Sequence, residues 1–396
     1  MNVLVANVGS TSFKYKLFEM PSERVLAEGR VERVGGRTSA FEHRVAGRDG
    51  AQGEAKIPDQ GAAIRHAIDA LTGPGGPIRD LSEVSAVGFK TVHMRGAPGY
   101  YPLTEDILGR MEEYNDLAPA HNPPYIQAIR ILQRVMPGTP LVGVFEPAFH
   151  ASIPDYAYIF GVPYRWFERY GVRRYGFHGA SHRYVAERVP RLMGLPAKGL
   201  RIVSCHLGGS ASACAIADGR SVDTSMGFSA QDGLLNATRN GEVDAFAILH
   251  VMDREGLSTA EVRDLLTREG GLLGISGVSG DMRDLEEAAL QGNDRCRLAI
   301  EAFCYGVKKT IGAYAAAMGG IEALAFAGGI GEKGVEVRRR ICEGLEFLGI
   351  RIDEGRNNSG PPERLISAEG GRVRVFIIRT DEEVVVARAT TEVIAR

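Results

Sequence analysis

The chain has 396 residues, which suits two domains of about 200 residues each. With 44% hydrophobic and 24% charged residues and a net charge of −2, it has the composition of an ordinary globular protein. This balance argues against a surface for nucleic acid or anionic membranes, and no apolar run is long enough to cross a bilayer. The five cysteines form no CxxC pair, so we expect reduced core thiols in a cytoplasmic protein.

The first predicted element is a β-hairpin with a small, polar turn. Residues 3–6 have the apolar run of a buried strand, residues 7–12 supply backbone NH and hydroxyl donors, and residues 13–19 alternate as a second strand. The same pattern returns at residues 201–217. A repeat at half the chain length predicts a gene duplication that gave two similar α/β domains. The alternative is a chance similarity between two turns rich in glycine and serine.

Between and after the hairpins, the apolar spacing predicts alternating helices and strands. Helices are expected at 60–71, 107–114, 126–135, 183–193, 242–255, 258–268, 295–318 and 335–348. Strands are expected at 86–89, 141–145, 323–326 and 373–378. This alternation indicates an α/β protein. We expect an N-terminal domain at 1–148, to which residues 384–396 return, and a C-terminal nucleotide-binding domain at 149–383.

Three glycine-rich segments follow predicted strands or apolar runs, at 206–212, 274–281 and 327–333. Such loops bind phosphates in α/β proteins, because backbone NH groups reach anionic oxygens there without steric cost. Together with the first hairpin, they predict a nucleotide site. No GxxxxGK[ST] is present, so a P-loop is not expected, and no GxGxxG supports a Rossmann cofactor site.

Several polar residues among small neighbours have either a catalytic or a structural role. Four histidines are of this kind: His121, His178, His182 and His206. Their spacing does not favour zinc, and an imidazole beside a transferring phosphoryl group would stabilise its charge. Arg239 could serve in the same way or lie on the surface. Residues 380–383 either suit Mg²⁺ or form the acidic first turn of a helix.

Taken together, these segments resemble the acetate kinase family of carboxylate kinases over nearly the whole chain. The matching runs keep their order and spacing, at 7–14, 173–182, 221–228, 271–284, 311–320, 329–332 and 380–383. The resemblance implies a duplicated actin- and hexokinase-like (ribonuclease H-like) α/β fold with a cleft between its domains. It also implies a cytoplasmic homodimer that uses Mg²⁺, ATP and a small carboxylic acid, with neither nucleic acid nor membrane as a partner.

The resemblance also assigns roles to residues. Asn7 and Glu382 would hold Mg²⁺, while His178, Arg239 and Glu146 would be catalytic in a direct in-line transfer. The nucleotide would be held by Lys14, by His206, Leu207, Gly208, Gly209 and Ser210, by Asp281, Met282 and Arg283, and by Gly329, Ile330, Gly331, Glu332 and Lys333. The acid would be held by Lys90, Val92, Ala120, His121, Phe177 and Ala230.

Four of these positions depart from the family pattern. Lys90 replaces an arginine and keeps its charge without its bidentate fork, and Glu146 replaces an aspartate. These two changes leave open a catalytically weakened, nucleotide-binding regulatory protein. Gly209 and Lys333 each replace an asparagine, which leaves open another phosphoryl donor or acceptor.

The expected acid pocket differs as well. Ala120 and Ala230 stand where the family has leucine and proline, so we expect a larger pocket and an acid larger than acetate. Arg95 would either reach a second polar group of the acid or be an exposed loop arginine.

Overall fold

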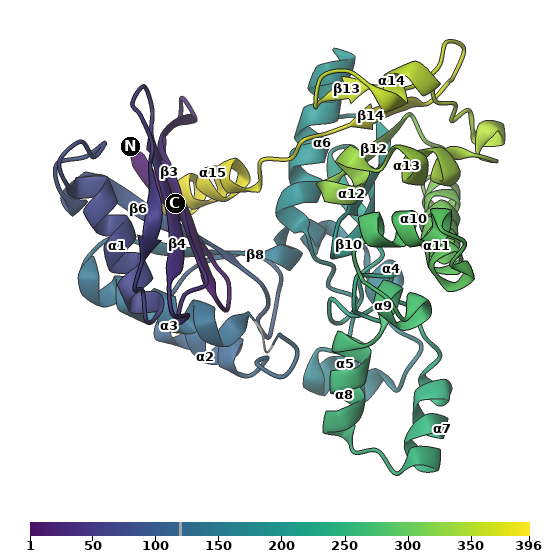
Figure 1. Ribbon diagram of the computed structural model, residues 1–396, viewed down its shortest axis with the longest axis horizontal. Helices are drawn as coiled ribbons and strands as arrows, with labels where there is room; N and C mark the ends of the chain where they lie inside the picture. The colour runs from purple at the N-terminus through teal and green to yellow at the C-terminus, as the bar shows by residue number, and fades with distance from the viewer. Residues whose placement is uncertain (119–120) are drawn as a thin grey trace. The chain divides into compact units, whose positions relative to one another are not determined.

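The computed structural model describes residues 1–118 and 121–396. They form two compact units, each with its own mixed β-sheet (Figure 1). Unit 1 comprises Met1–Ala148 and Asp381–Arg396, and unit 2 comprises Phe149–Thr380. The α/β class expected from the sequence is confirmed. None of the described helices is both long and apolar enough to span a bilayer.

Unit 1 is built on an eight-stranded sheet with the order β5-β4-β3-β2-β1-β6-β8-β7. Its strands are β1 (Asn2–Val8), β2 (Ser12–Glu19), β3 (Arg24–Glu32), β4 (Ser39–Val45), β5 (Ala51–Ala55), β6 (Val84–Thr91), β7 (Tyr100–Pro102) and β8 (Leu141–Phe145). Its α-helices are α1 (Gln60–Thr72), α2 (Glu105–Glu112), α3 (Asn122–Val135) and α15 (Glu382–Ile394). Short 3₁₀ turns are η1 (Leu81–Glu83) and η2 (Glu146–Ser152), which runs across the unit boundary.

The two faces of this sheet are covered by different helices. Side chains alternate along β1, and Leu4, Ala6 and Val8 pack with α1 and α3 in one core. The other face meets α15, since a Cβ atom on Gly88 of β6 would lie 2.9 Å from Cγ1 of Val386. Figure 1 shows α1 and α3 on one side of the strands and α15 on the other.

Unit 2 is built on a six-stranded sheet with the order β11-β10-β9-β12-β14-β13. Its strands are β9 (Arg201–Leu207), β10 (Ala211–Ala217), β11 (Arg220–Thr224), β12 (Ala323–Ala327), β13 (Arg364–Leu365) and β14 (Arg374–Ile377). Its helices are α4 (Asp155–Tyr158), α5 (Tyr164–Tyr170), α6 (Gly179–Met193), α7 (Ala245–Glu255), α8 (Thr259–Arg268), α9 (Gly271–Ser276), α10 (Met282–Leu290), α11 (Asp294–Ala317), α12 (Gly328–Lys333), α13 (Val335–Cys342), η3 (Glu346–Leu348) and α14 (Glu354–Asn358).

Five strands of each sheet share one topology, which supports the duplication. In unit 1, β2 lies antiparallel between β1 and β3, β6 is parallel to β1, and β8 is parallel to β6. In unit 2, β10 lies antiparallel between β9 and β11, β12 is parallel to β9, and β14 is parallel to β12. Both therefore open with the hairpin that the sequence predicted.

Some details of the sequence prediction were wrong. The helix expected at 335–348 ends at Cys342, because Gly344 adopts a left-handed conformation with φ 81°. The glycine-rich segment at 274–281, which follows an apolar run, comprises the end of α9 and the loop to α10. The five cysteines are buried free thiols, as expected.

Candidate active site

Three predicted site residues of unit 1 lie where parallel strands end. Asn7 is near the end of β1, Lys90 is near the end of β6, and Glu146 directly follows β8. Because β1, β6 and β8 run parallel, their carboxyl ends share one edge of the sheet. Open α/β sheets bind ligands at this edge, so the topology brings these distant positions together.

Lys90 joins two carboxylates at this edge. Its Nζ lies 3.0 Å from Oε1 of Glu146 and also forms an ion pair with Glu382. Asp381 caps α15, which places Glu382 in the first turn of this helix. Burial alone would lower the pKa of Lys90, but the two carboxylates outweigh it and hold that pKa well above its usual value. Lys90 is therefore a fixed cation.

Asn7 is oriented by a residue that the sequence reasoning missed. The hydroxyl of Tyr125, in α3, donates a hydrogen bond of 3.0 Å to Oδ1 of Asn7. Burial raises the pKa of Tyr125, so it remains a donor. Tyr125 falls on the apolar face of α3, where its spacing gives only a core signal.

The donor set at this edge fits Mg²⁺. The amide oxygen of Asn7 and the carboxylates of Glu146 and Glu382 belong to one cluster with Lys90 and Tyr125. Mg²⁺ takes few protein carboxylates and keeps several waters. Mg²⁺ therefore needs fewer protein ligands than a metal ion that is coordinated by protein side chains alone. Within residues 1–118 and 121–396, no group of three or more His, Cys, Asp or Glu side chains could hold a metal ion.

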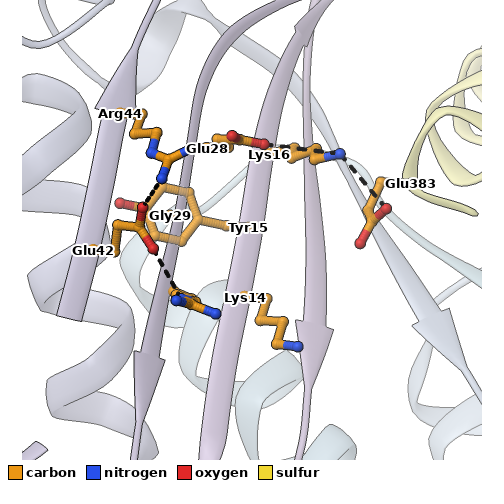
Figure 2. A pocket seen from close by; sticks show the side chains of 9 residues that line it. Lys14, Tyr15, Lys16, Glu28, Gly29, Glu42, Arg44 and Glu383 are labelled. Atoms are coloured by element: carbon orange, nitrogen blue, oxygen red, sulfur yellow. Dashed lines mark ion pairs between the residues drawn. The ribbon is translucent and has the colours of Figure 1, made fainter. Parts of the chain in front are cut away.

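Lys14 lies on β2, the strand next to that of Asn7. It pairs in register with Asn7 and lines an open pocket of about 310 Å³ on the face of β2, β3 and β4 (Figure 2). The pocket is lined by both positively and negatively charged side chains. Nζ of Lys16 lies 3.9 Å from Oε2 of Glu28 and 3.7 Å from Oε2 of Glu383. Figure 2 shows these ion pairs and the side chain of Lys14 lying apart from them.

In unit 2, a histidine cluster forms at the start of α6. His178 directly precedes this helix, in a left-handed conformation with φ 56° that is uncommon outside glycine and is frequent at functional sites. Its Nδ1 lies 2.8 Å from Oγ of Ser212, and its ring stacks on that of His206 with centroids 4.2 Å apart. The Oγ of Ser181 lies 2.8 Å from Nδ1 of His206. Serines therefore fix both rings.

Two further histidines lie beneath this pair. His182 is fully buried between Ser204 and Ser212, and burial holds its pKa well below its usual value. His150, which the sequence reasoning did not single out, contacts Ser221 and the carbonyl of Phe177, and burial lowers its pKa to about 4. Both are neutral at physiological pH, and His182 is a hydrogen-bonded residue of the core.

Arg239 is held in a tightly packed loop. Its Nη1 donates a hydrogen bond of 2.9 Å to the carbonyl of Ala230, and burial lowers its pKa. Gly271 packs against the loop at φ 61°, where a Cβ atom would lie 2.7 Å from the carbonyl oxygen of Arg239 and would contact that of Asn236. The backbone NH of Ala237 donates to the carbonyl of Gly209 at 2.9 Å, which links this loop to the turn after β9. Arg239 is a partly buried cation and not a surface arginine.

The expected nucleotide residues of unit 2 lie on several loops. Gly208, Gly209 and Ser210 form the turn between β9 and β10. Beside it, Gly328 starts α12 at φ 77°, where a Cβ atom would lie 2.6 Å from the carbonyl oxygen of Leu207. Only glycine fits this close approach of two backbones. The exposed Lys333 ends α12.

The segment at 281–283 opens α10. Asp281 caps this helix and pairs with the exposed Arg283, whose hydrogen bonds lower the pKa of Asp281 to about 2. Met282 points into the core of unit 2 and is 4% exposed, so any contact it makes with a nucleotide would come from its backbone.

A fully buried arginine behind α12 was also missed. Arg338 donates 2.8 Å to the carbonyl of Gly331 and 2.7 Å to Oδ1 of Asn357, and burial lowers its pKa to about 10. Arg338 therefore links Gly331 of helix α12 to Asn357 of helix α14. The sequence Arg338-Arg339-Arg340 gives no sign of which arginine is inside.

The residues expected to hold the acid come from both units. In unit 1, Val92 packs against the core and His121 precedes α3. In unit 2, Phe177 is buried and the carbonyl of Ala230 holds Arg239. Ala120 lies outside the described residues. Arg95 is exposed and pairs with Glu113 at 2.8 Å, which agrees with the loop alternative.

Comparison with known proteins agrees with the residue pattern. The sequence model of the acetokinase family matches residues 2–388. The acetate kinase of Carboxydothermus hydrogenoformans is 45% identical over 396 residues, covering 100% of this chain and 99% of the relative. That of Halothermothrix orenii is 44% identical, with 100% of both chains covered.

Two solved structures are similar over 99% of both chains. Porphyromonas gingivalis acetate kinase has a TM-score of 0.89 at 38% identity. A propionate kinase from Francisella tularensis has a TM-score of 0.90 at 31% identity. The fold and the motifs thus agree along the whole chain, which belongs to the acetokinase family of carboxylate kinases.

Proposed function

We propose that this protein phosphorylates the carboxylate of a small organic acid with ATP and Mg²⁺. A carboxylate oxygen attacks the γ-phosphorus as the bond to the β-phosphate oxygen breaks, and ADP leaves with that electron pair. The acid becomes an acyl phosphate. The observation that carries the proposal is the cluster of Asn7, Lys90, Glu146 and Glu382 at the strand ends, in a chain that matches this family throughout.

The residues of unit 1 would handle charge. Asn7 and Glu382 would hold Mg²⁺, which neutralises phosphate charge when bound. Lys90 orients Glu146 and Glu382 and would also attract the carboxylate of the acid. Lys14 would meet phosphate oxygens from the neighbouring strand.

The residues of unit 2 would bind the nucleotide and stabilise the transferring group. The turn Gly208–Ser210 and the glycine-rich start of helix α12 offer backbone NH groups to phosphates. Arg239 and His178 would donate to the phosphoryl oxygens as charge develops on them. Both are preorganised by hydrogen bonds within the protein, so they would lose little energy in reorientation.

The acid is proposed to be larger than acetate. The support is the small side chains at Ala120 and Ala230, where the resemblance gives larger family residues. The test is hydroxamate formation with acids of increasing chain length, with Mg²⁺ and with ATP, GTP or pyrophosphate as donor. A kcat/KM with ATP that peaks at a three- to five-carbon acid supports the proposal, whereas a clear maximum at acetate contradicts it.

We further propose a homodimer formed through unit 2. Helices α5, α7 and α8 have no fully buried residue within this chain. Their apolar side chains are nevertheless large and exposed, including Tyr164 at 61%, Trp166 at 41% and Phe246 at 79%. An amphipathic helix is stable mainly through burial of its apolar face, and a second copy would provide it.

A further inference from the structure

His178 is the outermost of a line of four hydrogen-bonding side chains that ends in the core of unit 2. Oγ of Ser212 is 2.8 Å from Nδ1 of His178 and 2.8 Å from Nε2 of His182. On the far side, Nδ1 of His182 is 2.9 Å from Oγ of Ser204. The order is therefore Ser204, His182, Ser212 and His178.

The positions of the protons along this line follow from counting donors. Ser204 is fully buried, and His182 is the partner of its hydroxyl within the described residues. A buried hydroxyl proton without an acceptor is costly, so Ser204 donates to Nδ1 of His182. His182 is neutral because burial lowers its pKa, so it carries a single ring proton.

The positions of the other two protons follow from the hydrogen bond that Ser204 donates to His182. With Nδ1 of His182 accepting, its proton sits on Nε2 and is donated to Oγ of Ser212. The single hydroxyl proton of Ser212 is then donated to Nδ1 of His178. The reverse order would leave the proton of Ser204 without an acceptor in the core.

We infer that Ser204, His182 and Ser212 are positioning residues that hold His178 in the tautomer with its proton on Nε2. In this tautomer, Nε2 presents a donor to a phosphoryl oxygen. In the other neutral tautomer, Nε2 would present a lone pair and repel that oxygen. The inference rests on the proposed role of His178 in transfer, whereas the tautomer is a property of the resting protein.

Loss of this hydrogen-bonded line should lower the turnover rate and leave substrate binding nearly unchanged. Removing the hydroxyl in Ser212→Ala lets His178 adopt either tautomer, so kcat should fall by about 10- to 100-fold, by analogy with hydrogen-bond partners that fix the tautomer of metal-bound histidines. The KM values for ATP and for the acid should change little, because Ser212 lies behind His178. Ser212→Thr keeps the hydroxyl and should restore much of the kcat.

The direct test is nitrogen NMR on the full-length protein with ¹⁵N-labelled histidine. The signals of His178 are assigned by their loss in His178→Asn. In the wild type, Nδ1 of His178 should have the shift of an unprotonated acceptor and Nε2 that of a protonated nitrogen. Ser212→Ala and Ser204→Ala should mix the two forms. Ser367→Ala is the control, because Ser367 is a buried serine of unit 2 whose hydroxyl has no partner within residues 1–118 and 121–396.

Each outcome decides the inference. A neutral His178 protonated on Nδ1 in the wild type overturns it, as does a Ser212→Ala protein with unchanged tautomer and kcat. If Ser212→Ala does not fold, the wild-type spectrum and Ser204→Ala decide. If the tautomer is as stated but no acid is phosphorylated, the positioning line stands and the proposed function fails.

Discussion

The ammonium group of Lys90 lies 3.0 Å from Oε1 of Glu146 and is also paired with Glu382. Lys90→Met should destabilise unit 1 by about 3–5 kcal/mol, because it leaves two carboxylates without their shared cation. It should also raise the KM for the acid. Thermal unfolding and steady-state kinetics provide the measurements.

Lys90→Arg is the matched control for this change, since it keeps the charge and supplies a bidentate fork. It should retain stability and keep or raise kcat/KM. Equal losses in both variants would show that the charge of Lys90 is not what the site requires.

Gly271 offers a test of the Arg239 loop without changing a charged residue. Gly271→Ala combines left-handed strain, about 1–3 kcal/mol, with a collision against the backbone of Arg239. Because displacement by about 1 Å can cost about 100-fold in rate, kcat should fall far more than stability alone explains.

Gly194→Ala serves as the control for strain. Gly194 has φ 67° at the end of α6, and nothing lies within 4 Å of an added Cβ atom. It should lower the melting temperature and leave kcat unchanged. If Gly271→Ala behaves in the same way, the packing of Gly271 does not position Arg239.

The buried His150 predicts a loss of stability in acid. Its folded pKa is about 4, below the ordinary value of 6.5, so between these values the unfolded chain binds a proton that the folded protein does not. Stability therefore rises with pH through this window and is lost as the pH falls towards 4, by about 3 kcal/mol from this group.

His182 acts in the same direction. The melting temperature of the wild type should drop between pH 6.5 and 4, and that of His150→Gln should drop less. A parallel decline in the two proteins would mean that His150 is not neutral in the fold.

Much of the fold could be predicted because its signals are local. The strand expected at 141–145 and the helix expected at 60–71 match β8 and α1 to within one residue, since an unbroken apolar run and a regular period identify them. Strand β5 gives no such signal, because four of its five residues are exposed. Helix α12 was interpreted as a loop, since Gly328, Gly329 and Gly331 are poor helix formers.

For the candidate site too, the local motifs could be predicted from the sequence, whereas the contacts between distant residues could not. Motifs identified Lys90 and Glu382, but their ion pair joins residues far apart in the chain, and only the fold reveals it. The support of His178 by Ser212 and Ser204 is equally non-local. Buried hydrogen bonds of this kind depend on which strands meet a helix, which residue spacing does not encode.

The exposed helices α5, α7 and α8 of unit 2 predict which substitutions would disrupt the proposed homodimer. Phe246→Glu combined with Leu249→Glu places two charges on α7, where the side chains are 79% and 52% exposed. If a second copy covers this face, the double variant should be a folded monomer by sedimentation equilibrium. Phe347→Glu, at a 73% exposed residue outside these helices, should remain dimeric. A monomeric wild type at micromolar concentration would contradict the proposed homodimer.

The central claim is transfer of the γ-phosphoryl group of ATP to a carboxylate, assisted by Arg239. The most direct measurement is trapping of the acyl phosphate with hydroxylamine, on the wild type and on Arg239→Ala. We predict hydroxamate that requires ATP, Mg²⁺ and the acid, and a kcat about 100- to 1,000-fold lower in Arg239→Ala. Absence of hydroxamate with every short carboxylic acid, or an Arg239→Ala protein that keeps most of its kcat, would contradict the account.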